Sequence, residues 1–227
     1  MGEPRVIFLH GLESGCGGRK HRFLQQHYEH VICVDMHMSL FNLAKRNGIA
    51  RNCLAHAFST APWNLLACSV QFSLDGCLQC QAAELAKASE TGGVLVGSSW
   101  GGAVAVLAIA KGLWKGPAVL IAPAYGAAVG RSGWRDPAYA PAEVYASMTR
   151  NLAEGSSGRV IIVHSTKDDT VPIADSRAMA QATGLELVEV EDGDHGMKCL
   201  LEGTHPRLKS LIDKAWSHNG GLPPSKY

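Results

Sequence analysis

The stretch 92-GGVLVGSSWGGAVAVLAIA-110 joins a run of β-branched residues to an alanine-rich apolar segment through glycines and two serines. It carries no charge over a length that could cross a membrane, but five of its residues are glycine and the serines interrupt its middle. A buried strand over residues 94–97 that leads into a buried helix from residue 100 explains the run equally well. We therefore predict a strand-turn-helix unit here and no membrane span.

The whole chain has 227 residues, of which 46% are hydrophobic, and a formal net charge of +1. This length can bury the core of one domain without help from a metal ion or disulfides. A charge so close to zero gives no strong attraction to nucleic acid or to anionic lipid. We expect a small-molecule partner and no nucleic acid, and the sequence leaves the oligomeric state open.

The chain contains seven cysteines, an odd number for a disulfide framework, so we expect them to be reduced. Cys77 and Cys80 form a lone C-x-x-C motif without a second pair or a preceding strand, and we predict neither a redox nor a zinc site there. The first ten residues lack the apolar core of a signal peptide. These features predict a cytoplasmic protein.

Short runs rich in valine and isoleucine alternate with helix-like stretches along the chain, which is the pattern of a parallel sheet covered on both faces. No strand is evident over residues 36–74, and residues 123–158 form a long insertion that should be functional or contain short helices. We predict one α/β domain over residues 1–217 and a disordered tail over 218–227. The predicted strands are 5–10, 31–35, 94–97, 118–122, 159–164 and 186–190, and the predicted helices are 19–29, 75–90, 100–112, 173–183 and 206–217.

The turn between the strand and helix of the opening stretch reads Gly97-Ser98-Ser99-Trp100-Gly101, a G-x-S-x-G pattern centred on Ser99. A turn this tight holds its central serine in a strained conformation and requires small residues two positions before and after it. Ser98 fails this test, because Val96 and Trp100 would occupy those positions. If either serine is a nucleophile, it is Ser99.

A serine hydroxyl needs a base and an orienting carboxylate to become a nucleophile, and in this architecture they follow in the order serine, acid, histidine. Asp168 follows the strand predicted over 159–164, and His195 follows the strand predicted over 186–190. Carboxyl ends of parallel strands meet at one edge of the sheet, where ligands bind. The three residues therefore belong to loops at one edge.

Such a site also needs backbone N–H groups that stabilise a developing oxyanion. The amide of Trp100, directly after the nucleophile, is one candidate. The second is the amide of Leu12, in the glycine-containing loop after the first strand.

Together these segments resemble the α/β-hydrolases, close to the compact esterases and thioesterases without a large cap domain. FLHGLES is similar to the oxyanion loop of that family, VGSSWGG to its nucleophile elbow, VIIVHSTKDDTVP to its acid loop and GDHG to its histidine loop. The resemblance covers residues 5 to 217 and implies a mostly parallel sheet of six or seven strands, reduced at the N-terminus. It favours Asp168 over Asp169 as the acid, because the aspartate stands four positions after the histidine of the acid loop.

Several alternatives remain. His10 and His164 fit structural roles at strand ends better than a role as the base. Arg19, Lys20 and Arg22 fit a solvated helix face better than a site for an acidic substrate group.

Two further side chains are candidates for the wall of an acyl pocket. Trp134, in the long insertion, and Met197, beside the histidine loop, could line it, although core or lid packing explains aromatic residues there equally well. We predict no metal ion and no organic cofactor.

The expected activity is a serine hydrolase that cleaves a carboxylic ester or thioester through an acyl-enzyme intermediate, with Ser99, Asp168 and His195 as catalytic residues. Two other functions are open: hydrolysis of a peptide, amide or polyester bond, and a catalytically silent protein that uses the pocket to bind a ligand.

Overall fold

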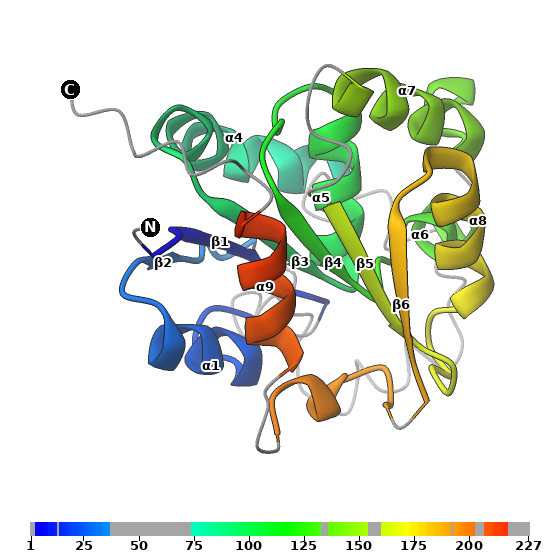
Figure 1. Ribbon diagram of the computed structural model, residues 1–227. Helices are drawn as coiled ribbons and strands as arrows, with labels where there is room; N and C mark the ends of the chain where they lie inside the picture. Colours follow the sequence, from blue (N-terminus) through cyan, green and yellow to red (C-terminus); the bar gives the residue numbers. More distant parts are fainter. Residues whose placement is uncertain are drawn as a thin grey trace, which may run out of the picture.

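The computed structural model describes residues 3–12, 14–36, 74–132, 136–153, 160–191, 193–202 and 207–217. Within these residues the strands form one six-stranded sheet in which every neighbouring pair is parallel (Figure 1). The order β2-β1-β3-β4-β5-β6 places β3, which leads into the serine turn, near the middle of the sheet. The strands are β1 (Val6–Leu9), β2 (Val31–Ile32), β3 (Val94–Ser98), β4 (Ala118–Ile121), β5 (Val160–Ser165) and β6 (Glu186–Val190).

Helices cover both faces of the sheet, because strand residues alternate between two hydrophobic clusters. In β1, Ile7 and Leu9 face one cluster, while Val6 and Phe8 face the other. The first cluster is covered by α4 (Leu74–Thr91), α5 (Trp100–Ala110), α6 (Tyr125–Ser132), α7 (Pro141–Ala153) and α8 (Ile173–Thr183). The second is covered by α1 (Arg19–His27) and α9 (Arg207–Ser217). Short 3₁₀ helices η3 (Pro137–Tyr139) and η5 (Lys198–Leu200) lie in the loops.

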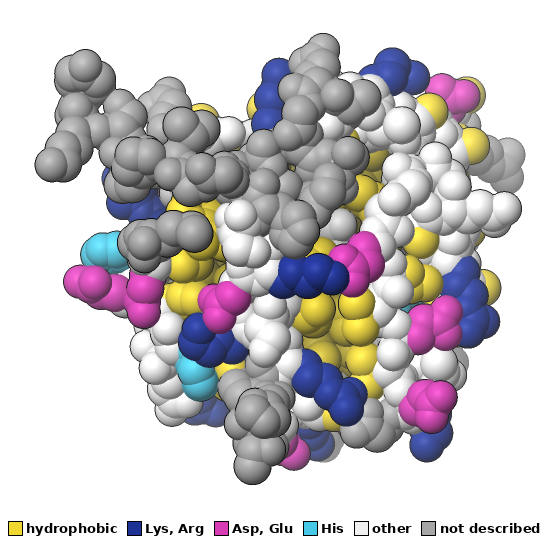
Figure 2. Space-filling model, viewed as in Figure 1, with side chains coloured by type: hydrophobic (Ala, Val, Ile, Leu, Met, Phe, Trp, Pro, Cys, Tyr) yellow, Lys and Arg dark blue, Asp and Glu magenta, His cyan; other side chains and the backbone are white. Residues whose placement is uncertain are grey.

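Hydrophobic side chains reach the surface on the face that carries α1 and α9 (Figure 2). Figure 2 shows hydrophobic side chains at the surface between α9 and the edge strand β6. Val188 of β6 is only partly buried there, against the second cluster. The edge strand β6 is therefore less buried than β3, all of whose residues are buried.

The fully apolar part of the opening stretch is α5, in which residues 101 to 109 are all buried. Its hydrophobicity reflects its position between the sheet and its neighbouring helices α4, α6 and α7. Among the described helices, none combines the length and the apolar character that a membrane crossing requires.

These observations confirm the predicted α/β fold class and the reduced parallel sheet. Strand and helix positions differ from the predicted ranges by a few residues at the ends. The long insertion contains α6, η3 and α7, as expected for a loop of that length. The unassigned stretch 36–74 lies almost wholly outside the described residues, and so does the predicted tail, so the predicted domain limits stay a prediction.

Candidate active site

Ser99 is the single residue between β3 and α5, and its backbone is strained. Its φ of 55° and ψ of −115° are unusual for a residue with a side chain. Hydrogen bonds hold it in place: its N–H donates to the Ile121 carbonyl at 2.9 Å, and its own carbonyl accepts from the amides of Ala103 and Ala124, each at 3.0 Å. The turn presents the serine side chain at the carboxyl edge of the sheet.

The residues two before and two after Ser99 must be glycine. This agrees with the small residues that the sequence analysis required at these two positions. A Cβ on Gly97 would lie 2.7 Å from the Gly101 carbonyl oxygen, and a Cβ on Gly101 would lie 2.1 Å from the Leu9 carbonyl oxygen. Both distances are shorter than any side chain tolerates. The first turn of α5 therefore packs directly against the end of β1.

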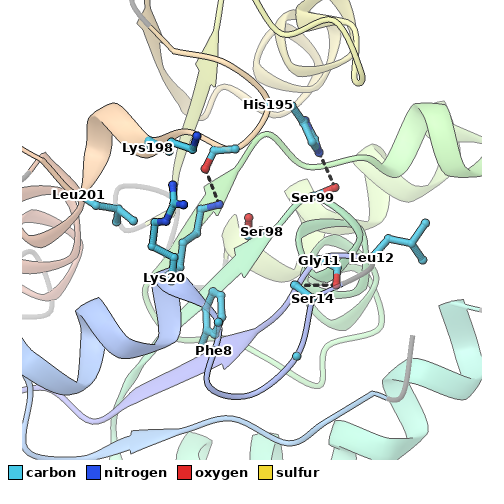
Figure 3. Close-up of a pocket in the computed structure, with 14 residues that line it drawn as sticks. Phe8, Gly11, Leu12, Ser14, Lys20, Ser98, Ser99, His195, Lys198 and Leu201 are labelled. Atoms are coloured by element: carbon cyan, nitrogen blue, oxygen red, sulfur yellow. Dashed lines mark hydrogen bonds between the residues drawn. The ribbon is translucent and has the colours of Figure 1, made fainter. Parts of the chain in front are cut away.

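Ser99, His195 and Asp168 form a continuous chain of hydrogen bonds. His195 Nε2 lies 2.9 Å from Ser99 Oγ (Figure 3), and His195 Nδ1 lies 2.7 Å from Asp168 Oδ2. A carboxylate can only accept, so Nδ1 carries a proton and the neutral ring leaves Nε2 free to accept from the serine hydroxyl. The three residues come from loops after β3, β5 and β6, as predicted.

The Asp168 side chain is fully buried and surrounded by donors. Its Oδ1 accepts from the main-chain amides of Thr170 at 2.9 Å and Val171 at 2.8 Å. Burial acts to raise the pKa of this carboxyl, but the bonds from Val171, His195 and Thr170 outweigh it and the pKa is lowered. Asp169 instead accepts from the side chain of Thr170 at the surface.

A second histidine, His164, binds the same carboxylate oxygen. Its Nε2 lies 3.1 Å from Asp168 Oδ2 and 3.1 Å from the Val171 carbonyl, and its Nδ1 lies 2.7 Å from Ser176 Oγ. Two acceptors at Nε2 require the proton there, so the Ser176 hydroxyl donates to Nδ1. Burial lowers the pKa of His164, and this keeps the ring neutral despite the raising influence of Asp168.

Sequence reasoning assigned His164 only a structural role at a strand end. The sequence feature that indicates a contact with the acid is the position of His164 four residues before Asp168. The contact itself depends on how the loop after β5 turns back on that strand.

The loop after β1 lies against the serine turn. A Cβ on Gly11 would lie 3.3 Å from both the Ser98 carbonyl oxygen and Ser99 Cβ. Buried His10 holds this loop in place: its Nε2 accepts from the Met36 amide at 2.9 Å and lies 3.2 Å from Asp35 Oδ1, and its Nδ1 donates to the Gly11 carbonyl at 2.9 Å. This agrees with the structural role predicted for His10, and Leu12, the residue after Gly11, lines the same cavity as Ser99.

The side chains of the other candidate site residues lie away from the cavity or outside the described residues. Trp100 opens α5, and its indole N–H donates to Cys77 Sγ of α4 at 3.4 Å, so its side chain packs against that helix. Met197 is fully buried in the second hydrophobic cluster and does not line the pocket, because its loop turns it inward toward the sheet. Trp134 lies outside the described residues.

A cavity of about 340 Å³ opens beside Ser99 and His195 (Figure 3). Its walls come from the loop after β1, the start of α1, the serine turn and the histidine loop with η5. Arg19 and Lys20 are among its lining residues. Arg19 is exposed, as is Arg22, which does not line the cavity, whereas Lys20 is partly buried, so the solvated helix face that the sequence favoured does not hold for Lys20.

No protein-family model and no curated protein matches the sequence. Solved structures do match over nearly the whole chain. A hydrolase of the α/β superfamily from Xanthomonas campestris pv. campestris has 21% sequence identity and a TM-score of 0.54, with 96% of this chain and 99% of that chain covered. The chain has the α/β-hydrolase fold.

Two further α/β-hydrolase-fold structures extend the comparison. Est1E from Butyrivibrio proteoclasticus has 17% identity and a TM-score of 0.58, and the match covers 96% of this chain and 88% of that one. A monoacylglycerol lipase from Paleococcus ferrophilus has 15% identity and a TM-score of 0.56, with coverage of 96% and 97%. Both matches cover most of this chain and most of the other protein. This agrees with the compact α/β-hydrolase fold expected from the sequence.

Proposed function

We propose that this protein is a serine hydrolase that cleaves a carboxylic ester or thioester through an acyl-enzyme intermediate. The observation that carries the proposal is the hydrogen-bonded series from Ser99 through His195 to Asp168. A nucleophile, a base and an orienting carboxylate in this order are the parts that acyl transfer needs. The lipase among the structures of the same fold agrees with this activity.

In the first step, Ser99 Oγ attacks the substrate carbonyl while His195 Nε2 takes the hydroxyl proton. The distance of 2.9 Å between these atoms suits direct transfer. The charge that forms on the imidazole is stabilised by Asp168, whose lowered pKa keeps its carboxylate ionised. His195 then returns the proton to the leaving group as the carbon–oxygen or carbon–sulfur bond breaks.

The tetrahedral intermediate needs donors for its oxyanion. We propose the main-chain amides of Leu12 and Trp100, since these residues follow β1 and Ser99 at the same edge of the sheet. The close packing of Gly11 on Ser99 supports the first of them. Water, activated by His195, then releases the acid from the serine, so this chemistry requires no cofactor.

The test is hydrolysis of p-nitrophenyl esters from acetate to palmitate by wild type and by Ser99→Ala. We expect turnover by wild type and a loss of at least about 10⁴-fold in kcat for Ser99→Ala, because the triad then lacks its nucleophile. The chain-length optimum measures how long an acyl group the pocket accepts. A fully active alanine variant would contradict the mechanism.

A fluorophosphonate probe provides a second readout that does not depend on finding the natural substrate. An activated serine displaces fluoride and becomes phosphonylated, so we expect wild type and Ser98→Ala to be labelled and Ser99→Ala not to be. Ser98 is the matched control, as the neighbouring serine on the same strand end. A folded wild-type protein that neither turns over esters nor reacts with the probe would favour a ligand-binding role.

A further inference from the structure

Three cationic side chains line the cavity beside Ser99. Arg19 and Lys20 come from the first turn of α1, and Lys198 opens η5, directly after the histidine loop. Figure 3 shows Lys20 and Lys198 on one side of the cavity and Ser99 with His195 on the other. No aspartate or glutamate is among the described residues that line this cavity. The ionisable side chains among the described lining residues, apart from His195, are therefore all cationic.

No salt bridge between described residues neutralises these cations. Within the described ranges, none of the three forms an ion pair, whereas other helix cations such as Lys111 and Arg177 pair with Asp75 and Glu189. Lys20 Nζ donates to the Gly196 carbonyl at 2.8 Å, and this bond holds its ammonium group one residue away from His195. Asp194 is the acid whose charge acts on Lys20, but it is exposed and bridges none of the three.

The start of α1 adds to this field. Its N-cap residue is Gly18, which has no side chain to cap the first turn, and that turn contains no acidic residue. The amides at a helix N-terminus carry partial positive charge, so basic residues there are locally unfavourable. A negatively charged ligand in the cavity would offset the repulsion and interact favourably with the positive end of the helix.

We propose that the substrate carries an anionic group, such as a carboxylate, that binds between Arg19, Lys20 and Lys198 while its acyl carbonyl lies at Ser99. This inference rests on the proposed hydrolase function and specifies its substrate class. The cavity of about 340 Å³ accommodates a small anionic ester beside the nucleophile. Lysine and arginine side chains bind such groups through charge-assisted hydrogen bonds.

The experiment compares matched pairs of esters that differ in one charge. On the acyl side, the pair is mono-p-nitrophenyl glutarate and p-nitrophenyl pentanoate. On the leaving-group side, it is 4-butyryloxybenzoate and 4-butyryloxybenzamide. The measured quantity is the ratio of kcat/KM for the anionic ester to that for its neutral partner, and the pair with the larger ratio shows which half of the substrate the cations bind.

Substitutions of the cavity lysines then test whether the preference for anionic esters comes from the cavity. We expect Lys20→Gln and Lys198→Gln each to lower the ratio by roughly 3- to 10-fold, as for a partly exposed charge pair. Arg22→Gln is the matched control: it removes one charge from the same helix, but Arg22 does not line the cavity. Its ratio should equal that of wild type.

The pH dependence provides an independent check on Lys20. Burial lowers the pKa of Lys20 to about 8; Asp194 and Cys199 act to raise it, and Arg19 to lower it further. Lys20 is charged below that pH and neutral above it, so the ratio should fall as the pH rises through about 8. Both esters share the same catalytic groups, and Lys20→Gln should lack this fall.

The outcomes separate the two proposals. Hydrolysis that depends on Ser99, with equal ratios in wild type and both lysine variants, would overturn the anionic substrate and leave the hydrolase standing. A wild-type protein that neither hydrolyses any of the four esters nor reacts with fluorophosphonate would overturn both. Lower ratios in the lysine variants but not in Arg22→Gln would establish the site.

Discussion

At the scale of single residues, the Asp168 carboxylate is the group on which the candidate site converges. Two main-chain amides hold one oxygen, and the imidazoles of His164 and His195 share the other. A carboxylate fixed by four donors cannot rotate to follow its neighbours, so His195 must orient to it. The shared oxygen also means that His164 positions the acid without contacting Ser99.

Substitution of the two adjacent aspartates tests this role. Asp168→Asn should lower kcat by about 10⁴-fold, because an amide in this place favours the wrong tautomer of His195. Asp169→Asn should change kcat little, since Asp169 accepts from the surface hydroxyl of Thr170, whereas His195 binds Asp168. Ester hydrolysis by the two variants measures this, and a larger loss for Asp169→Asn would identify the wrong carboxylate.

At the scale of elements, the serine turn works because β1, β3 and α5 approach one another without side chains between them. The backbone of α5 at Gly101 lies against the end of β1, and Gly102 lies against Pro123, after β4. These contacts hold the strained φ of Ser99, which an isolated turn would relax. The site therefore depends on helix-to-strand packing as much as on its polar residues.

Gly101→Ala should be strongly destabilising for this reason. The added methyl group would overlap the Leu9 backbone, and we expect the free energy of unfolding to fall by about 3 kcal/mol or more. Gly130→Ala in α6 is the control, because its Cβ would meet nothing within 4 Å and alanine favours helix by about 1 kcal/mol. Urea unfolding followed by circular dichroism measures both, and equal effects would contradict the packing argument.

At the scale of the whole molecule, one sheet separates two hydrophobic clusters that share its strands. Side chains alternate between them along β1, β3, β4 and β5, so neither cluster can be lost while the strands keep their pairing. The candidate site lies at the carboxyl edge of this sheet and takes its parts from loops after four of its strands. Its geometry should persist as long as the sheet does.

Two core substitutions on opposite faces test this coupling. Leu24→Ala and Leu120→Ala each remove a fully buried side chain, one from each cluster, and should each cost about 2–5 kcal/mol. Because the clusters share strands, both variants should unfold in one transition in which circular dichroism and tryptophan fluorescence coincide. Separate transitions for the two probes would show that the faces unfold independently.

The sequence alone determined the class of fold, the sheet strands and the residues of the candidate triad. Short β-branched runs predicted the strands, and Gly97 and Gly101, as small residues on either side of Ser99, predicted the serine turn. The loops of the acid and the histidine followed, because parallel strands bring all their carboxyl ends to one edge, and the resemblance to the α/β-hydrolases selected Asp168 over Asp169. Each of these patterns involves residues close together in the chain, so it can be recognised in a single sequence.

The tertiary structure alone decided how side chains from distant segments meet. His164 reaches the acid only because the loop after β5 folds back on its strand, and Met197 points into the core because its backbone turns it there. The charge of Arg19 and Lys20 is visible in the sequence, but whether it faces water or the nucleophile depends on how α1 docks on the sheet beside the histidine loop. Such docking is set by packing between segments far apart in the chain, which no local pattern records.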